Sequence, residues 1–185
     1  VEGKKMSKSL GNFFTLRDIF SKFDPMVVRF FLLSTHYRSP INYSDQELTA
    51  AREAYSRIVN FIGDLDYLLA KSTESSPTVE LADLKEELLE YQNKFKASMD
   101  DDFNSAGALA AVFEMITYCR KTLAEGEAER ECLMFMRTSV VELCGILGIK
   151  LESKKQNVER GTQVENLIAE RETARKNKDF TKSPF

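Results

Sequence analysis

The sequence contains little of the material from which metal centres and secreted scaffolds are built. It has one histidine, His36, and its three cysteines, Cys119, Cys132 and Cys144, include no Cys-x-x-Cys pair. The cysteines lie in apolar sequence of helical spacing, which indicates small buried side chains in a reducing cytoplasm. We expect no metal site in this chain, because these residues do not assemble into a zinc site of the usual Cys/His type.

Long apolar runs and a large excess of either charge are missing too. No stretch has the length of a membrane-spanning helix and no signal peptide is present, so we expect a cytoplasmic protein without membrane contact. The net charge is −3, so any contact with RNA needs a local basic patch. The first residue is valine, which suggests a piece of a longer protein.

A short basic loop opens the chain. Residues 4–12 read Lys-Lys-Met-Ser-Lys-Ser-Leu-Gly-Asn and follow Gly3. Three ammonium groups and two hydroxyls on a mobile segment suit a polyphosphate whose negative charge grows during a reaction. For an arbitrary Lys-x-x-Lys the alternative is a solvated basic turn.

Helix-start signals and amphipathic spacing predict helices along most of the remaining chain. The start signals are Thr15 with Asp18, Asp24 with Pro25, and Ser44 with Glu47. A helix over 26–33 is favoured by its cap, although a buried strand fits its apolar run as well. One long helix is predicted after residue 44 by apolar residues spaced three and four apart, Leu48, Ala51, Tyr55, Ile58, Ile62, Leu65 and Leu69.

Three further helices are expected near 81–99, 106–123 and 133–147, after linker-like sequence at 72–78. Four amphipathic helices with short connections fold most simply as an antiparallel bundle, so the fold class is all-α. The triplet Asp100, Asp101 and Asp102 is interpreted as helix capping in preference to metal binding.

Three segments follow from this pattern. Residues 1–43 hold the loop and short helices, 44–150 the helical bundle, and 151–185 a linker and a basic C-terminal helix. The last 36 residues carry nine basic and six acidic side chains, a net charge of +3. That helix is as well explained by solvated charge pairs as by contact with RNA.

Lys5-Met6-Ser7-Lys8-Ser9 matches letter for letter the KMSKS signature of class I aminoacyl-tRNA synthetases. The chain resembles the cysteinyl-tRNA synthetases in particular, and the resemblance covers nearly its whole length. It is carried further by residues 10–18, by Asp24-Pro25 and the run to Leu33, and by residues 36–44, 99–104, 168–171 and 174–180.

The resemblance implies a ligase that activates cysteine with ATP and Mg²⁺ and transfers it to tRNA-Cys. Lys5 and Lys8 would be the catalytic residues and Lys5, Met6, Ser7, Lys8 and Ser9 the ATP-binding set, with Lys8 the more direct contact. Ser7 and Ser9 would bind phosphate or fix the loop, and Met6 would anchor it to the body. The bundle would be the anticodon-binding domain, and the protein a monomer.

Basic residues in the helical part are candidates for tRNA contact, although phosphate contacts would position RNA without reading its sequence. They are Arg38, Arg52, Arg57, Arg171, Arg175 and Lys176.

Two parts of the family pattern are absent. The HIGH-type motif needs histidines, whereas the only one here lies in His36-Tyr37-Arg38, and the zinc ligands that select the cysteine thiol belong outside this chain. We therefore expect the chain alone to be inactive. The alternatives are the ligase that joins cysteine to a glucosamine-inositol in mycothiol biosynthesis, and a stand-alone helical RNA-binding module.

Overall fold

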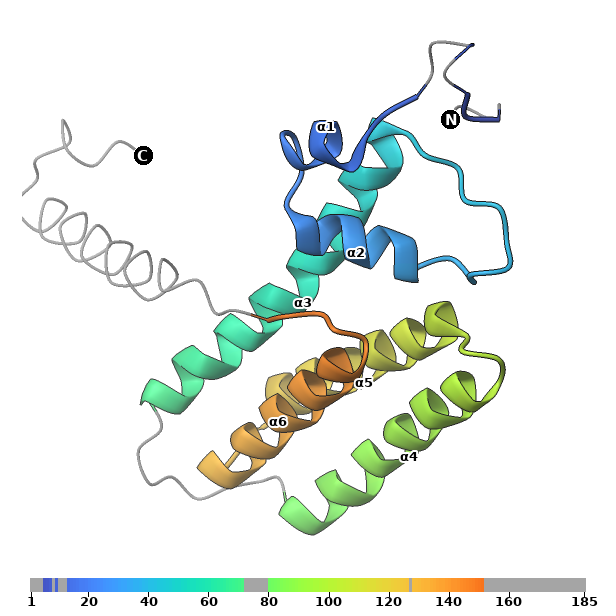
Figure 1. Cartoon of the computed structure of the whole chain (residues 1–185). Coiled ribbons are helices and arrows are strands. Elements are labelled where there is room, and N and C mark those ends of the chain that lie inside the picture. The colour runs from blue at the N-terminus through green and yellow to red at the C-terminus, as the bar shows by residue number, and fades with distance from the viewer. Residues whose placement is uncertain (1–4, 8, 10–12, 72–79, 127, 152–185) are drawn as a thin grey trace, which may run out of the picture. The chain divides into compact units, whose positions relative to one another are not determined.

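The computed structural model describes residues 5–7, 9, 13–71, 80–126 and 128–151. The chain divides into two units, Val1–Leu151 and Glu152–Phe185, and the description concerns the first. The expected basic C-terminal helix lies outside the described residues. In the described part the structure is helical without β-strands (Figure 1), which confirms the all-α prediction and excludes a strand at 26–33. The helices are α1 (Leu16–Phe20), α2 (Pro25–Leu33), α3 (Asp45–Lys71), α4 (Leu81–Asp100), α5 (Ser105–Glu125) and α6 (Arg130–Ile146).

The three start signals act as predicted. The Thr15 hydroxyl accepts from the backbone N–H of Asp18, and the Asp18 carboxylate accepts from the backbone N–H of Thr15 at 2.9 Å. The Thr15 hydroxyl also donates to the Asp18 carboxylate at 2.6 Å, and the bonds from this hydroxyl and from the Thr15 N–H to the carboxylate lower the pKa of Asp18. Asp24 caps α2, and the Ser44 hydroxyl accepts from the N–H of Glu47 at the start of α3.

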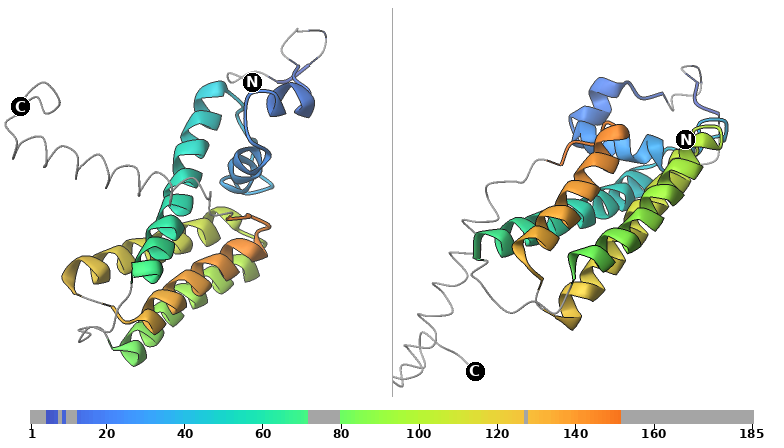
Figure 2. Two further views of the ribbon diagram at one scale, coloured as in Figure 1. Left: turned by 90° about the vertical axis from the view of Figure 1, so that its left-hand side faces the viewer. Right: turned by 90° about the horizontal axis from the view of Figure 1, so that it is seen from below.

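Helices α3 to α6 run alternately in opposite directions, which confirms the antiparallel bundle (Figures 1 and 2). Helix α4 packs along α5 and α6, while α3 packs against α2 and α6. At about 1.5 Å per residue, the 27 residues of α3 extend for roughly 40 Å. Helix α3 contacts α2 of the N-terminal segment near its start and contacts α5 and α6 of the bundle further along (Figure 1).

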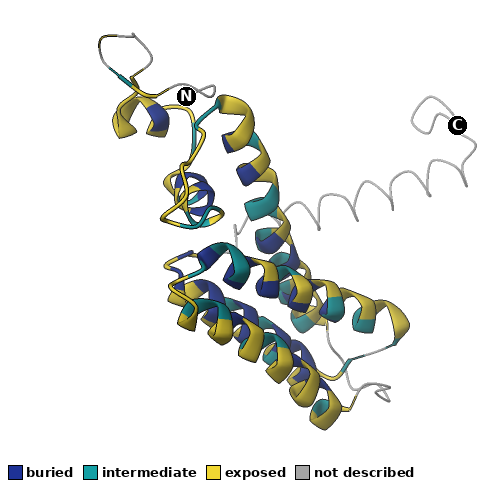
Figure 3. Ribbon diagram, turned by 90° about the vertical axis from the view of Figure 1, so that its right-hand side faces the viewer, coloured by how far each residue is buried: buried dark blue, intermediate teal, exposed yellow. Residues whose placement is uncertain are grey.

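The predicted stripe of α3 forms its buried face. Leu48, Ile58 and Leu65 are fully buried, and the outer faces of the helices are exposed (Figure 3). Phe61, which lies outside that stripe, is only 1 % exposed. The buried stripe is wider than the spacing predicted, because α3 contacts α2, α5 and α6 together.

The chain leaves α6 through a turn that other helices hold in place. Gly148 has φ +66°, and the N–H of Ile149 donates to the carbonyl of Cys144 at 2.9 Å. From α2, Arg29 donates to the carbonyl of Leu147 at 3.4 Å. From α3, the Tyr55 hydroxyl donates to the carbonyl of Lys150 at 2.8 Å. The end of α6 is thus fixed to both earlier helices.

Candidate functional site

The basic loop is described at Lys5, Met6, Ser7 and Ser9, whereas Lys8 lies outside the described residues. The side chains of Lys5, Met6 and Ser9 are exposed. The hydroxyl oxygens of Ser7 and Ser9 are 2.8 Å apart and share a hydrogen bond. Either serine can be the donor in this bond. The described part of the loop thus brings a lysine and two hydroxyl groups together on an exposed segment.

The segment after the loop is tied to α2 and α3 by aromatic and charged contacts. The ring of Tyr43 lies 5.5 Å from that of Phe14 and 6.5 Å from that of Phe31, centroid to centroid. The Lys22 ammonium lies 3.3 Å from the Asp45 carboxylate at the start of α3. These contacts join the segment that carries the loop to the long helix, although the sequence motif alone says nothing about this attachment.

Arg38 takes part in a polar cluster that joins two distant parts of the chain. Its Nε lies 2.9 Å from Asp102 Oδ2, and its Nη2 donates to Oδ1 at 3.1 Å. The Tyr37 hydroxyl donates to the same Oδ1 at 2.8 Å, and His36 Nε2 lies 3.9 Å from Oδ2. The Asp102 carboxylate thus accepts one charge-assisted hydrogen bond from Arg38 and one from the Tyr37 hydroxyl, and the Arg38 Nε–H donates to the Tyr37 oxygen at 2.9 Å. We call these four residues the Asp102 clasp.

The clasp corrects the interpretation of the aspartate triplet as a helix cap. The N-cap of α5 is Asn104, whose side chain accepts from the N–H of Gly107 at 2.9 Å. Asp100 is the last residue of α4, and the Asp102 carboxylate accepts from Tyr37 and Arg38 instead of from the α5 N-terminus. Asp102 and Phe103 both have φ +53°. Sequence spacing did not reveal this contact, because its partners are more than sixty residues apart.

Arg52 and Arg57 lie on α3 with exposed side chains. The Arg57 guanidinium lies 5.1 Å from the ring centroid of Phe113 on α5, a cation–π contact. Arg52 is available to an anionic partner by its exposure alone. Arg171, Arg175 and Lys176 lie outside the described residues, so the structure places half of the six tRNA-contact candidates.

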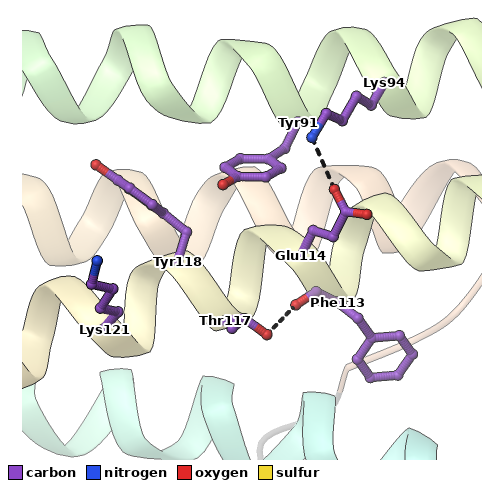
Figure 4. A pocket seen from close by; sticks show the side chains of 7 residues that line it. All are labelled: Tyr91, Lys94, Phe113, Glu114, Thr117, Tyr118 and Lys121. Atoms are coloured by element: carbon purple, nitrogen blue, oxygen red, sulfur yellow. Dashed lines mark hydrogen bonds and ion pairs between the residues drawn. The ribbon is translucent and has the colours of Figure 1, made fainter.

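An open groove of about 520 Å³ lies between α4 and α5 (Figure 4). Tyr91 and Tyr118 face each other across it with their ring centroids 5.8 Å apart, and burial raises the pKa of both phenols. Lys94 crosses from α4 to Glu114 on α5 at 3.0 Å. The other lining residues are Phe113, Thr117 and Lys121. The sequence pattern did not predict this groove, because its lining comes from two helices.

Among residues 5–7, 9, 13–71, 80–126 and 128–151, no three His, Cys, Asp or Glu side chains are grouped to hold a metal ion. All three cysteines are buried, and burial raises the pKa of Cys119 and of Cys144 to about 12. Both thiols are therefore protonated near neutral pH. None of the helices in this part of the chain is long and apolar enough to span a membrane.

Two family models match the chain. Residues 1–53 match the catalytic domain of class I (C) tRNA synthetases, and residues 94–152 match the DALR domain. The basic loop and the Tyr37–Arg38 half of the clasp lie in the first match. Asp102, Phe103 and most of the groove lie in the second.

Curated relatives are similar over nearly the whole chain. The cysteine–tRNA ligase of Lachnoclostridium phytofermentans is 39% identical over 188 residues, which cover 99% of this chain and 39% of the relative. Those of Trichlorobacter lovleyi and Geobacter metallireducens are 40% and 37% identical, again over 99% of this chain and 41% of each relative. The chain spans about two fifths of the length of these relatives. Over 99% of its residues the chain is therefore similar to cysteine–tRNA ligases, and residues 1–53 match the catalytic domain of class I (C) tRNA synthetases.

Proposed function

We propose that this chain is the tRNA-binding part of a ligase that activates cysteine with ATP and joins it to tRNA-Cys. The observation that carries the proposal is the 39% identity to a cysteine–tRNA ligase, which covers 99% of the chain and both matched segments. The relatives are cysteine–tRNA ligases, which favours this function over the glucosamine-inositol ligase. The antiparallel helical bundle supports it as well, since it offers a rigid surface for RNA.

The basic loop is proposed to act on ATP in the first step. A cysteine carboxylate oxygen attacks the α-phosphorus, the bond from that phosphorus to the bridging oxygen breaks, and pyrophosphate leaves. Mg²⁺ would neutralise part of the phosphate charge. Lys5 and Lys8 neutralise the negative charge that grows on the leaving group, and Lys8 makes the more direct contact. Ser7 and Ser9 donate to phosphate oxygens or fix the loop, and the exposed Met6 completes the ATP-binding set.

The tRNA is proposed to lie along the helical part of the chain. Residues 1–43 would complete the catalytic region, 44–150 would form the anticodon-binding domain, and 151–185 would begin a further tRNA-binding segment. The roughly 40 Å length of α3 suits a ligand that reaches from a reaction centre to a distant recognition surface. Contacts with the tRNA are assigned to Arg38, Arg52, Arg57, Arg171, Arg175 and Lys176.

Zinc is proposed to be held by residues outside this chain. The described residues do not fit the ion, because His36 is engaged at the Asp102 clasp and the three thiols are separately buried. We propose that the part of the ligase that binds cysteine lies outside this chain as well. We expect the 185-residue chain alone to give no cysteine-dependent ATP–pyrophosphate exchange, and measurable exchange by the purified chain would contradict this.

The test of tRNA binding compares tRNA-Cys with a transcript that has a changed anticodon, at low and at moderate salt. Tighter binding of tRNA-Cys at both salt concentrations is the expected result, and it would show that the chain itself reads the anticodon. Equal, strongly salt-dependent binding of both would restrict its role to phosphate contacts. Failure to bind either RNA would contradict the proposed function and favour the glucosamine-inositol ligase.

A further inference from the structure

Phe103 occupies a backbone conformation that its side chain disfavours. Its φ of +53° lies in the left-handed region, where a bulky residue is an outlier. Asp102 before it has the same φ. The ring does not gain burial in return, because Phe103 is 68% exposed. A residue that combines backbone strain with an exposed aromatic ring is not explained by packing.

The turn does not need a phenylalanine to close α4. The last carbonyls of α4 are satisfied by backbone donors, with the N–H of Phe103 bonded to Met99 and that of Asn104 bonded to Ser98. Glycine at position 103 would keep both bonds and adopt the positive φ without steric cost. The phenyl ring therefore serves a purpose other than the fold of the turn.

Neighbouring contacts hold this turn in place. The Asp102 carboxylate is fixed by Tyr37 and Arg38, and the Ser105 hydroxyl donates to the carbonyl of Leu33 at 2.8 Å. Tyr37 is itself 60% exposed and stacks on His36, with ring centroids 4.9 Å apart and planes 23° apart. Exposed aromatic rings are thus presented on a rigid support, which lowers the entropy lost on binding.

The clasp joins the two family-matched segments, since Tyr37 belongs to residues 1–53 and Asp102, next to Phe103 in sequence, to residues 94–152. An RNA that contacts both segments can reach Phe103 at this junction. We propose that Phe103 stacks on an unpaired nucleobase of the bound tRNA. This inference rests on the proposed function and names one point of contact within it.

Charge at the junction determines the kind of contact. Arg38 is neutralised by Asp102, and the adjacent Asp100 and Asp101 are exposed. Carboxylates repel phosphates but accept hydrogen bonds from the amino groups of bases. The contact is therefore directed at a base, through stacking on the ring, and it releases few counterions.

The test measures the affinity of the 185-residue chain for a tRNA-Cys transcript, together with thermal melting of each variant. Phe103→Leu keeps an apolar side chain without a ring and is expected to weaken binding about tenfold, the usual scale of a lost base–aromatic stack. Phe103→Tyr keeps the ring and should bind as the parent does.

Phe103→Gly relieves the backbone strain, so it should weaken tRNA binding while its melting temperature is no lower than that of the parent. Ile146→Ala, at a residue 65% exposed on α6, is the matched control and should change neither value.

Each outcome separates the two proposals. A parent chain that fails to bind tRNA overturns both. A parent that binds, with Phe103→Leu unchanged in affinity, overturns the stacking contact alone. A large fall in the melting temperature of Phe103→Gly would assign the ring to folding and overturn it as well. The expected loss in Phe103→Leu should persist from low to moderate salt with an unchanged salt slope.

Discussion

Gly148 is required at the end of α6 by its backbone and by its surroundings. Its φ is +66°, and a Cβ there would lie 2.8 Å from Arg29 Nη1. Gly148→Ala is expected to lower the free energy of unfolding by about 1–3 kcal/mol, because the left-handed region penalises a Cβ and Arg29 must move. Urea unfolding measures the change.

Gly145→Ala is the matched control for that substitution. Gly145 lies within α6, and a Cβ there would meet nothing within 4 Å. Alanine should stabilise this helix position by up to about 1 kcal/mol. Equal destabilisation by both substitutions would contradict the role assigned to Gly148.

The buried cysteines predict slow thiol chemistry. Because burial disfavours the thiolate, the pKa of Cys119 and of Cys144 is raised to about 12, and both stay protonated from neutral pH to well above it. We expect a thiol reagent to leave both unlabelled in the folded chain across that range and to label them in urea. Rapid labelling of either residue in the folded protein, located by peptide mass, would contradict the burial.

Among the helices, α3 contacts α2, α5 and α6 through its buried face. Leu65 is fully buried, whereas Leu68 on the same helix is 37% exposed. Leu65→Ala should lower the free energy of unfolding by about 2–5 kcal/mol through lost burial and a cavity. Leu68→Ala, as the control, should cost much less, and similar losses in urea unfolding would mean that the buried face of α3 is assigned wrongly.

The helix starts could be predicted from local sequence, whereas the contacts between distant segments could not. Thr15, Asp24 and Ser44 cap the helices that they were predicted to start, because a cap is satisfied within three residues of chain. Asp102 was misread as part of a cap, since its partners Tyr37 and Arg38 lie in a remote segment. The groove at Tyr91 and Tyr118 likewise depends on two helices together. The spacing of residues within one segment does not predict contacts with a distant segment.

At the scale of the whole molecule, the KMSKS residues and the bundle are expected to act in one ligase. In the complete ligase that the proposal implies, Lys8→Ala should lower the rate of cysteine-dependent ATP–pyrophosphate exchange by about 100-fold or more, because charge on the leaving pyrophosphate loses a partner. Lys22→Ala removes a lysine that is exposed and paired with Asp45. It should leave the rate nearly unchanged. Equal effects of the two substitutions would contradict the role of Lys8.

The helices, the caps at Thr15, Asp24 and Ser44, most of the buried face of α3 and the KMSKS resemblance could be read from the sequence, because each of these depends on residues close together in the chain. The contacts of Arg38 and Tyr37 with Asp102, the exposure of Phe103 at positive φ and the packing of Gly148 against Arg29 were visible only in the folded structure. These features arise when helices from distant segments pack together. Their energies depend on that packing, and no local spacing encodes it.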